Sequence, residues 1–204
     1  NGNITANATG MQAINVPARR KSMKSIFFVG ASQTGLNNTN YRQSFAGNLQ
    51  LNSYHAKIGS INHPATPIEC NMNANGPGGA DLNGRGEALM ELSKCFGTTG
   101  SVVGLGQLNR MNYAIRTGLA AEGRVAISTP FQFAPMGLDL EAFQRTAIES
   151  GINTADRSTP ITLVLDVGTD AAGAAIAEAI NIDCYVSFDS LYYIDSTGII
   201  SVSH

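Results

Sequence analysis

The stretch "CYVSFDSLYYIDSTGIISVSH", residues 184–204, decides the fold class that the sequence predicts. Residues 195–198 (DSTG) have turn composition, and Gly198 supplies the positive φ that a hairpin turn needs. After the turn, Ile200 and Val202 alternate with serines, which is the period of a strand with one buried face. The stretch therefore predicts a β-hairpin whose apolar face closes a sheet begun by the N-terminal part of the domain.

Earlier stretches of the sequence also place apolar residues at every second position. They are bounded by Gly, Pro, Asn and Ser, as strands usually are. The predicted strands are residues 22–32, 49–61, 124–134, 159–168 and 180–188. In the 159–168 segment, Ile161, Leu163 and Leu165 face one way. In the 49–61 segment, Pro64 and Pro67 follow the alternating run, and we expect them to end the strand.

Two segments change to a helical period. Residues 85–97 place Leu89, Leu92 and Phe96 at helical spacing. Residues 137–151 predict a second short helix, capped by Asp139. Each helix lies between segments of turn composition, so we expect both helices to sit in loops between strands.

Short strands separated by long polar loops, without βαβ alternation, predict an all-β fold: an antiparallel jelly-roll β-sandwich with short helices in the loops. Residues 1–17 are small, polar and aperiodic, and predict a flexible N-terminal arm. Residues 18–204 then form a single jelly-roll domain. Six side chains spread over the predicted strands are expected in the core or facing the sheet: Phe27, Ile58, Leu163, Leu165, Tyr193 and Ile200.

The composition is poor in charge and rich in small polar residues. Charged residues make up 14% of the chain and the formal net charge is −2, against about 25% charged residues in typical domains. Such a surface fits a protein partly buried against neighbours. The one basic cluster, residues 19–21 with Lys24, is interpreted as a solvated strand entrance, so there is no strong nucleic-acid signal.

The sequence gives no sign of a membrane span or of a signal peptide. No apolar run approaches 18 residues, and no secretory leader opens the chain. The first residue is Asn1 rather than Met. We therefore expect the chain to be a processed product, a fragment, or the visible part of something longer.

Motifs of catalysis and of metal binding are missing from the sequence. Cys70, Cys95 and Cys184 lack metal-ligand spacing and are expected to be free thiols, while His55 and His63 lie eight residues apart with an expected turn between them. No nucleophile elbow, P-loop or complete dinucleotide loop occurs. We therefore predict no enzyme, no catalytic residue, no cofactor and no metal, although a carboxylate pair assembled in space stays open.

The order of three motifs resembles a known protein family. They are "KIGSINHP" at residues 57–64, "LDLEAFQ…SGINT…ITLVLDV" within 138–167, and the closing hairpin. In this order they are similar to the C-terminal jelly roll of viral major capsid proteins of the double-jelly-roll lineage, which includes the adenovirus hexon, polinton-like elements, virophages and large DNA viruses. The chain departs from that pattern in having room for one jelly roll instead of two. The resemblance therefore implies either the second half of a longer or cleaved capsid protein, which the missing Met at position 1 favours, or a single-jelly-roll relative.

The resemblance implies a structural, non-enzymatic capsid subunit. It would self-assemble as trimers of pseudo-hexagonal outline into an icosahedral shell. Its partners would be other copies of the capsid protein and a second jelly roll, with minor capsid proteins possible. Its localisation would be the virion, after assembly inside the host cell. We expect the subunit contacts in residues 33–48, 71–86 and 97–123.

Two other function classes stay open. A jelly-roll binding module, such as a lectin-like or receptor-binding domain, would be a monomer with saturable ligand binding. An enzyme on a sandwich scaffold would lose hydrolytic activity when one carboxylate is replaced.

Overall fold

The computed structural model describes residues 2–32, 51–70, 83–96, 135–141, 150–156, 159–168 and 179–203. The elements within these ranges are the strands β1 (Gly2–Ile4), β2 (Gly10–Val16), β3 (Met23–Ser32), β4 (Leu51–Ile58), β5 (Ile61–Glu69), β6 (Met136–Asp139), β7 (Ile161–Val167), β8 (Ile180–Phe188), β9 (Leu191–Ile194) and β10 (Ile200–Ser203), and the helix α2 (Asn83–Cys95).

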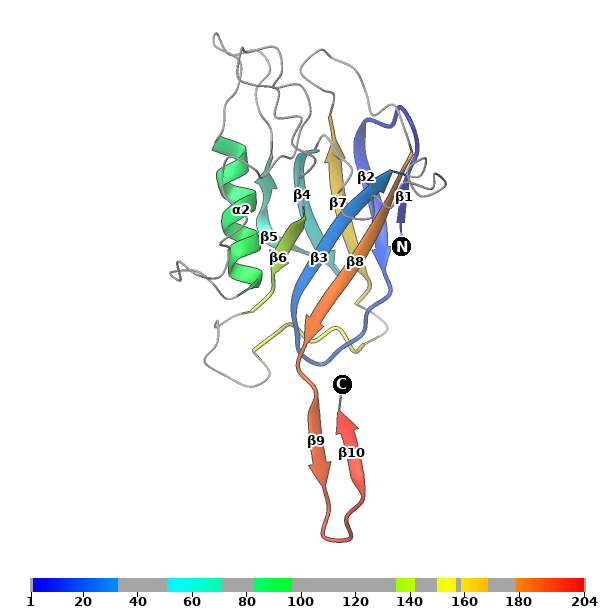
Figure 1. The fold of residues 1–204 in the computed structure, drawn as a ribbon, viewed down its shortest axis with the longest axis vertical. Helices are drawn as coiled ribbons and strands as arrows, with labels where there is room; N and C mark the ends of the chain where they lie inside the picture. Colours follow the sequence, from blue (N-terminus) through cyan, green and yellow to red (C-terminus); the bar gives the residue numbers. More distant parts are fainter. Residues whose placement is uncertain are drawn as a thin grey trace.

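The first eight strands form two four-stranded sheets, with strand orders β1-β8-β3-β6 and β2-β7-β4-β5. Their pairs are nested along the chain: β1 pairs with β8, β2 with β7, β3 with β6 and β4 with β5, all antiparallel. The chain therefore follows one long hairpin that is rolled into two sheets (Figure 1). This is the strand order of a jelly roll, and the predicted fold class is confirmed.

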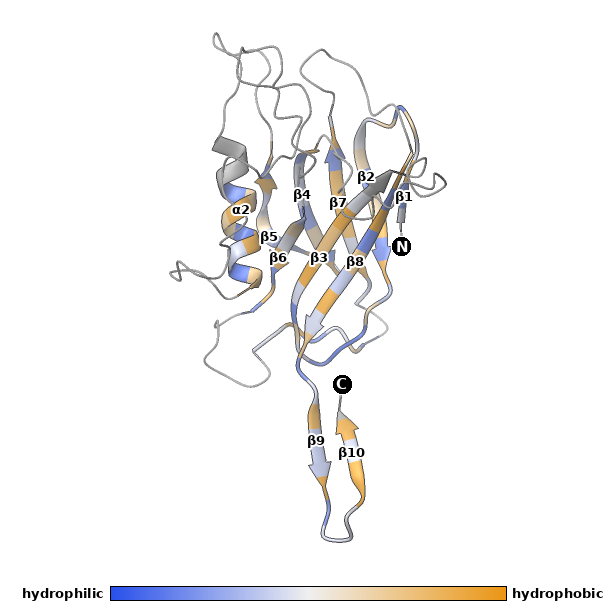
Figure 2. Cartoon of the chain, viewed as in Figure 1, coloured by the Kyte–Doolittle hydropathy of each residue, from blue (hydrophilic) through white to orange (hydrophobic). Residues whose placement is uncertain are grey.

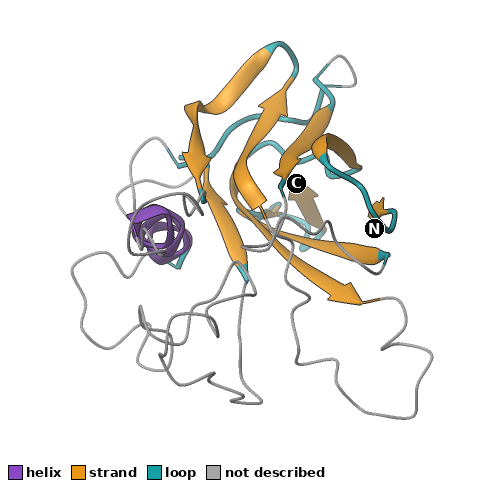
Figure 3. Cartoon of the chain, turned by 90° about the horizontal axis from the view of Figure 1, so that it is seen from above, coloured by secondary structure: helices purple, strands orange, loops and turns teal. Residues whose placement is uncertain are grey.

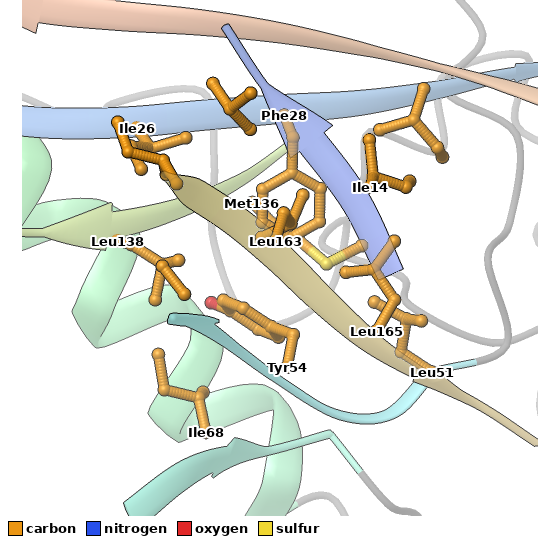
Figure 4. Packing of buried hydrophobic residues seen from close by; sticks show 14 of the residues in the cluster. Ile14, Ile26, Phe28, Leu51, Tyr54, Ile68, Met136, Leu138, Leu163 and Leu165 are labelled. Atoms are coloured by element: carbon orange, nitrogen blue, oxygen red, sulfur yellow. The ribbon is translucent and has the colours of Figure 1, made fainter. Parts of the chain in front are cut away.

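The core lies between the two sheets, which face each other (Figure 3). On β7, Ile161, Leu163, Leu165 and Val167 are buried and the residues between them are only half-buried, as the predicted alternation requires. Figure 4 shows side chains of both sheets meeting in this layer. The core prediction is confirmed for Ile58, Leu163 and Leu165.

Two aromatic side chains join the sheets at the centre of the core. The rings of Phe28 on β3 and Tyr54 on β4 meet edge to face, with centroids 5.2 Å apart. The Tyr54 hydroxyl donates a hydrogen bond of 3.1 Å to the carbonyl oxygen of Gly137 on β6. The buried phenol therefore has a partner, and it links the β4 sheet to the last strand of the other sheet.

Helix α2 packs along β6 and β5, which are edge strands of the two sheets (Figure 1). Ala88 and Leu92 of the helix are fully buried. The Glu91 carboxylate accepts a 3.0 Å hydrogen bond from the backbone N–H of Asp139, the last residue of β6. The helix predicted at residues 85–97 is thus confirmed, beginning two residues earlier and ending at Cys95.

The N-terminal arm predicted for residues 1–17 is wrong for residues 2–4 and 10–16. These residues are strands β1 and β2, and Ile4, Ile14 and Val16 are buried. Ile14 and Val16 have the spacing of a strand, but small and polar residues dominate the rest of the segment. Together with Ile4 they fill one edge of the sandwich.

Two further predictions of element boundaries are wrong. Pro64 and Pro67 do not end a strand but lie within β5. This strand is at a sheet edge, where a residue without N–H need not break the ladder. The helix predicted at residues 137–151 does not begin at Asp139, which ends strand β6. The Asp139 Oδ1 atom accepts a 3.1 Å hydrogen bond from the backbone N–H of Glu141, and residues 142–149 lie outside the described residues.

Several predicted segments lie outside the described residues. They are the strand at 124–134, most of the helix at 137–151, and the contact segments 33–48 and 97–123. Of the contact segment 71–86, only residues 83–86 are described, and they begin α2.

Candidate interaction surface on the terminal hairpin

Strands β9 and β10 form the hairpin that the sequence predicts. Ile194 lies opposite Ile200, and Leu191 opposite Ser203. The backbone N–H of Asp195 donates to the carbonyl of Ile199 at 3.1 Å. Gly198 has a φ of 82°, in the left-handed region that glycine adopts without strain. The predicted turn and its glycine are confirmed.

Asp195 organises the tip of this hairpin. Its Oδ1 atom accepts hydrogen bonds from the Thr197 hydroxyl at 2.6 Å, from the Thr197 backbone N–H at 2.8 Å and from the Ile199 backbone N–H at 2.9 Å. The hydrogen bond from the Thr197 side chain, followed by that from the Ile199 backbone, lowers the pKa of the Asp195 carboxyl below its usual value. The tip is thus a locally satisfied turn.

The hairpin has one fully apolar face. Residues directly opposite each other on paired strands share a face, so Tyr192 and Val202 lie on the same side as Ile194 and Ile200. These four residues are the apolar face. The other side pairs Tyr193 with Ser201 and Leu191 with Ser203, so each of its pairs contains a serine.

The apolar face is exposed, and the prediction that it is buried in this domain is wrong. Its four side chains are between 42% and 71% exposed. The core prediction for Tyr193 and Ile200 is wrong for the same reason. Strands β9 and β10 join neither four-stranded sheet but form a sheet of their own, which projects past the end of the sandwich (Figure 1). Figure 2 shows the apolar residues along both strands.

The root of the hairpin is fixed to the sandwich through Asp189. The backbone N–H of Asp189 donates to the Ser22 carbonyl at 3.0 Å, and the Ser22 hydroxyl donates to Asp189 Oδ2 at 2.9 Å. Lys24 Nζ lies 3.2 Å from Asp189 Oδ1. The chain therefore leaves β8 from a position that several polar contacts define.

Lys24 connects the root of the hairpin to the segment that follows β6. Its Nζ atom lies 2.9 Å from Glu141 Oε1, which also accepts a hydrogen bond from the Ser150 hydroxyl. The hydrogen bond to Glu141 is the largest cause of a raised Lys24 pKa. Nearby, the Arg20 guanidinium lies 4.2 Å from the centre of the Phe188 ring at the end of β8. The end of β8 is thus held on both sides.

A second exposed apolar cluster lies on the outer face of the β1-β8-β3-β6 sheet. Phe27 of β3 lies opposite Tyr185 of β8, and its ring centroid is 5.0 Å from that of Phe96, just after α2. Tyr185 is 60% exposed and Phe96 is 51% exposed. These three residues are the aromatic patch. Phe27, which we expected in the core or facing the sheet, is partly buried on this outer side.

The two histidines are not brought together. His63 lies opposite Ala56, the residue next to His55 on β4, so strand alternation puts the two side chains on opposite faces of the sheet. Burial lowers the pKa of both imidazoles.

In the part of the chain that the structure describes, no group of three or more His, Cys, Asp or Glu could hold a metal ion. The absence of enzymatic chemistry stays a prediction.

The three cysteines are free thiols. Cys70 is buried, and Cys95 and Cys184 are partly buried. Burial is the largest cause that raises the pKa of each thiol. Because the thiolate is the reactive form, these cysteines are poor nucleophiles at neutral pH.

Comparisons of the chain with protein-family models, with curated proteins and with solved structures found no match. Among the described residues, no helix has the length and apolar character needed to cross a bilayer. The geometry of the hairpin and of the aromatic patch therefore carries the functional argument, together with the motifs in the sequence.

Proposed function

We propose that this chain is a structural subunit of a viral capsid, which self-assembles as trimers of pseudo-hexagonal outline into an icosahedral shell. The observation that carries the proposal is a jelly roll that holds an amphipathic hairpin away from its own core, with the apolar face exposed. A chain that exposes a contiguous apolar face of this kind is suited to binding another protein surface.

Further features of the sequence and of the fold support the same function. The order of the sequence motifs resembles that of double-jelly-roll capsid proteins. The nested strand pairs are those of the fold that such proteins use. The low content of charged residues, 14%, suits a subunit whose surface is largely buried against neighbours. The partners are then other copies of the capsid protein and a second jelly roll, within a virion.

The direct test is the assembly state of the 204-residue chain. Light scattering combined with negative-stain microscopy should show trimers or closed shells. If a double jelly roll is required, the chain should form pseudo-hexagonal particles only when the preceding half is added. A monomer of 21.4 kDa under all of these conditions would overturn the proposal.

The aromatic patch favours a second candidate, a lectin-like binding module. Exposed aromatic rings such as Tyr185 and Phe96 can stack on the apolar faces of sugar rings. This function predicts a monomer with saturable glycan binding that is lost in Tyr185→Ala. A glycan array with the wild-type chain and this variant separates the two candidates.

A further inference from the structure

We propose that the apolar face of the hairpin in one copy of this chain packs on the aromatic patch of a second copy. This inference rests on the proposed function and names the contact that drives assembly. One surface consists of Tyr192, Ile194, Ile200 and Val202. The other consists of Phe27, Tyr185 and Phe96.

The two surfaces do not meet within one molecule. The hairpin projects beyond the end of the sandwich, and the aromatic patch lies on the side of the sheet (Figure 1). Both remain exposed in the same chain. The hydrogen bonds and the ion pair of Asp189 hold the root beside Ser22 and Lys24, so the hairpin starts from a fixed position at the end of the sandwich. A second copy can accept the hairpin without disturbing these contacts.

The chemistry of the two surfaces matches. The hairpin offers β-branched side chains with one aromatic ring, and the patch offers three aromatic rings. Pairs of aromatic and β-branched side chains are among the favourable contacts on sheet surfaces. Neither surface contains a carboxylate, an ammonium or a guanidinium group, so their contact removes no unpaired charge from water.

The exposed area is sufficient for a specific contact. From the exposed fractions, the apolar face, the adjacent Ile199 and the aromatic patch together expose roughly 800 Å², given about 150–250 Å² for a whole aromatic side chain. Apolar atoms make up roughly 60% of a typical interface. The complete contact would then bury about 1,300 Å², which is within the range of stable protein interfaces.

The contact joins two different surfaces, so it is heterologous. Each copy donates one hairpin and accepts another, and such contacts close into a ring or continue as a chain. A ring of three copies would give the trimer of the proposed function. Two hairpins packed on each other would instead give an isologous dimer.

The experiment uses two variants and two matched controls. Ile200→Lys places a charge on the apolar face, and Ser201→Lys places the same charge one residue away on the opposite face. Tyr185→Lys places a charge in the aromatic patch, and Ser187→Lys places it two residues along the same side of β8. Sedimentation velocity over a concentration series measures self-association, and circular dichroism checks that each variant is folded.

We expect Ile200→Lys and Tyr185→Lys each to weaken self-association by at least about thirtyfold, as for a residue central to an interface. Both controls should associate like the wild type. Mixing the two deficient variants should restore a contact, because Tyr185→Lys has an intact hairpin and Ile200→Lys has an intact patch. The mixture should form a heterodimer and stop there.

Three results would overturn the inference. If Tyr185→Lys assembles like the wild type while Ile200→Lys does not, the hairpin packs on some other surface. If neither variant differs from its control, or the mixture forms no heterodimer, the donor and acceptor surfaces are wrong. In each of these cases a wild-type chain that assembles leaves the proposed function standing, whereas a wild-type chain that stays monomeric, also when the preceding half is added, overturns both.

Discussion

At the scale of single residues, Leu163 shows how the core holds the two sheets together. It is fully buried on β7, which pairs with β2 on one side and with β4 on the other. Leu163→Ala should lower the free energy of unfolding by about 2–5 kcal/mol, because it removes buried methyl groups and leaves a cavity. Urea denaturation followed by circular dichroism measures this change.

The neighbouring Thr162→Ala is the matched control for Leu163→Ala. Thr162 lies on the other face of β7 and is only half-buried. It should cost much less stability. Equal losses for the two variants would show that the inward register of β7 is wrong.

Asp195 gives a prediction about pH. Its carboxyl pKa is lowered below 3.8, with the Thr197 side-chain hydrogen bond as the largest cause. When a carboxyl pKa is lower in the folded chain than in the unfolded chain, the stabilisation is complete above the pKa of the unfolded chain. It is lost as the pH falls through the pKa of the folded chain. An NMR titration should give an Asp195 midpoint below 3.8.

The matched variants for this titration lie in the same turn. Thr197→Val removes the hydroxyl donor and should raise the Asp195 midpoint toward its usual value. Ser196→Ala should leave the midpoint where it is in the wild type. A midpoint that does not respond to Thr197→Val would contradict the role of this hydroxyl.

At the scale of elements, α2 and β6 approach each other closely at Gly137. A Cβ atom at this position would lie 2.7 Å from the Cys95 sulfur and 3.2 Å from Leu92 Cδ1. Gly137→Ala should therefore push α2 from β6 and cost about 1–3 kcal/mol of stability. Thermal unfolding measures the loss.

A double variant separates crowding from other effects of Gly137→Ala. Adding Cys95→Ala removes the nearest atom, so the double variant should lose less than the sum of the two single losses. Strictly additive losses would show that the methyl group is accommodated without displacing α2.

The root of the hairpin should depend on pH through Lys24. Its pKa is raised above 10.5, mainly by the hydrogen bond to Glu141. For a raised pKa, the stabilisation is complete below 10.5 and is lost as the pH rises through the raised value. The free energy of unfolding of the wild type should therefore fall above pH 10.5 more steeply than that of Lys24→Met.

Glu141→Gln tests which partner dominates at this root. It should flatten the alkaline loss of stability more than Asp189→Asn does, because the Glu141 hydrogen bond is the larger cause. Urea denaturation at a series of alkaline pH values measures both. The same slope in the wild type and in Lys24→Met would contradict the assignment.

Elements with a strong period were predictable from the sequence, and elements set by tertiary pairing were not. Strand β7 alternates over its whole length, and α2 has apolar residues at helical spacing. Strand β1 has three residues and β6 has four, so neither is long enough to show a period. They are strands because β8 and β3 supply partners for their backbones.

At the scale of the whole molecule, the hairpin is an addition to a sandwich that is complete without it. Deleting residues 190–204 should leave the unfolding midpoint of the sandwich nearly unchanged, because β9 and β10 belong to neither four-stranded sheet. The same deletion should abolish self-association. Calorimetry and sedimentation on the truncated chain measure the two effects, and a large fall in the midpoint would show that the hairpin supports the core.

The sequence predicted the apolar face of the hairpin in part, but it did not predict the aromatic patch. Alternation in the terminal hairpin indicates that one face needs cover from water. The pattern identified Ile200 and Val202 of that face, but Tyr193, which was also expected in the core or facing the sheet, lies on the opposite side of the hairpin. The alternation does not indicate which chain provides the cover. The aromatic patch had no signal in the sequence, because Phe27, Tyr185 and Phe96 come from distant segments that meet only in the fold.

The nested strand pairs also set the order of events during synthesis. Ile4 pairs with Ile180, so the sandwich cannot close until nearly all of its strands have left the ribosome. At about 5–20 residues per second, β1 waits roughly 10 to 35 seconds for its partner. Residues 191–203 follow almost at once. The hairpin with its exposed apolar face thus leaves the ribosome only when the sandwich can fold. This order shortens the time in which an incomplete chain could bind another chain through its hairpin.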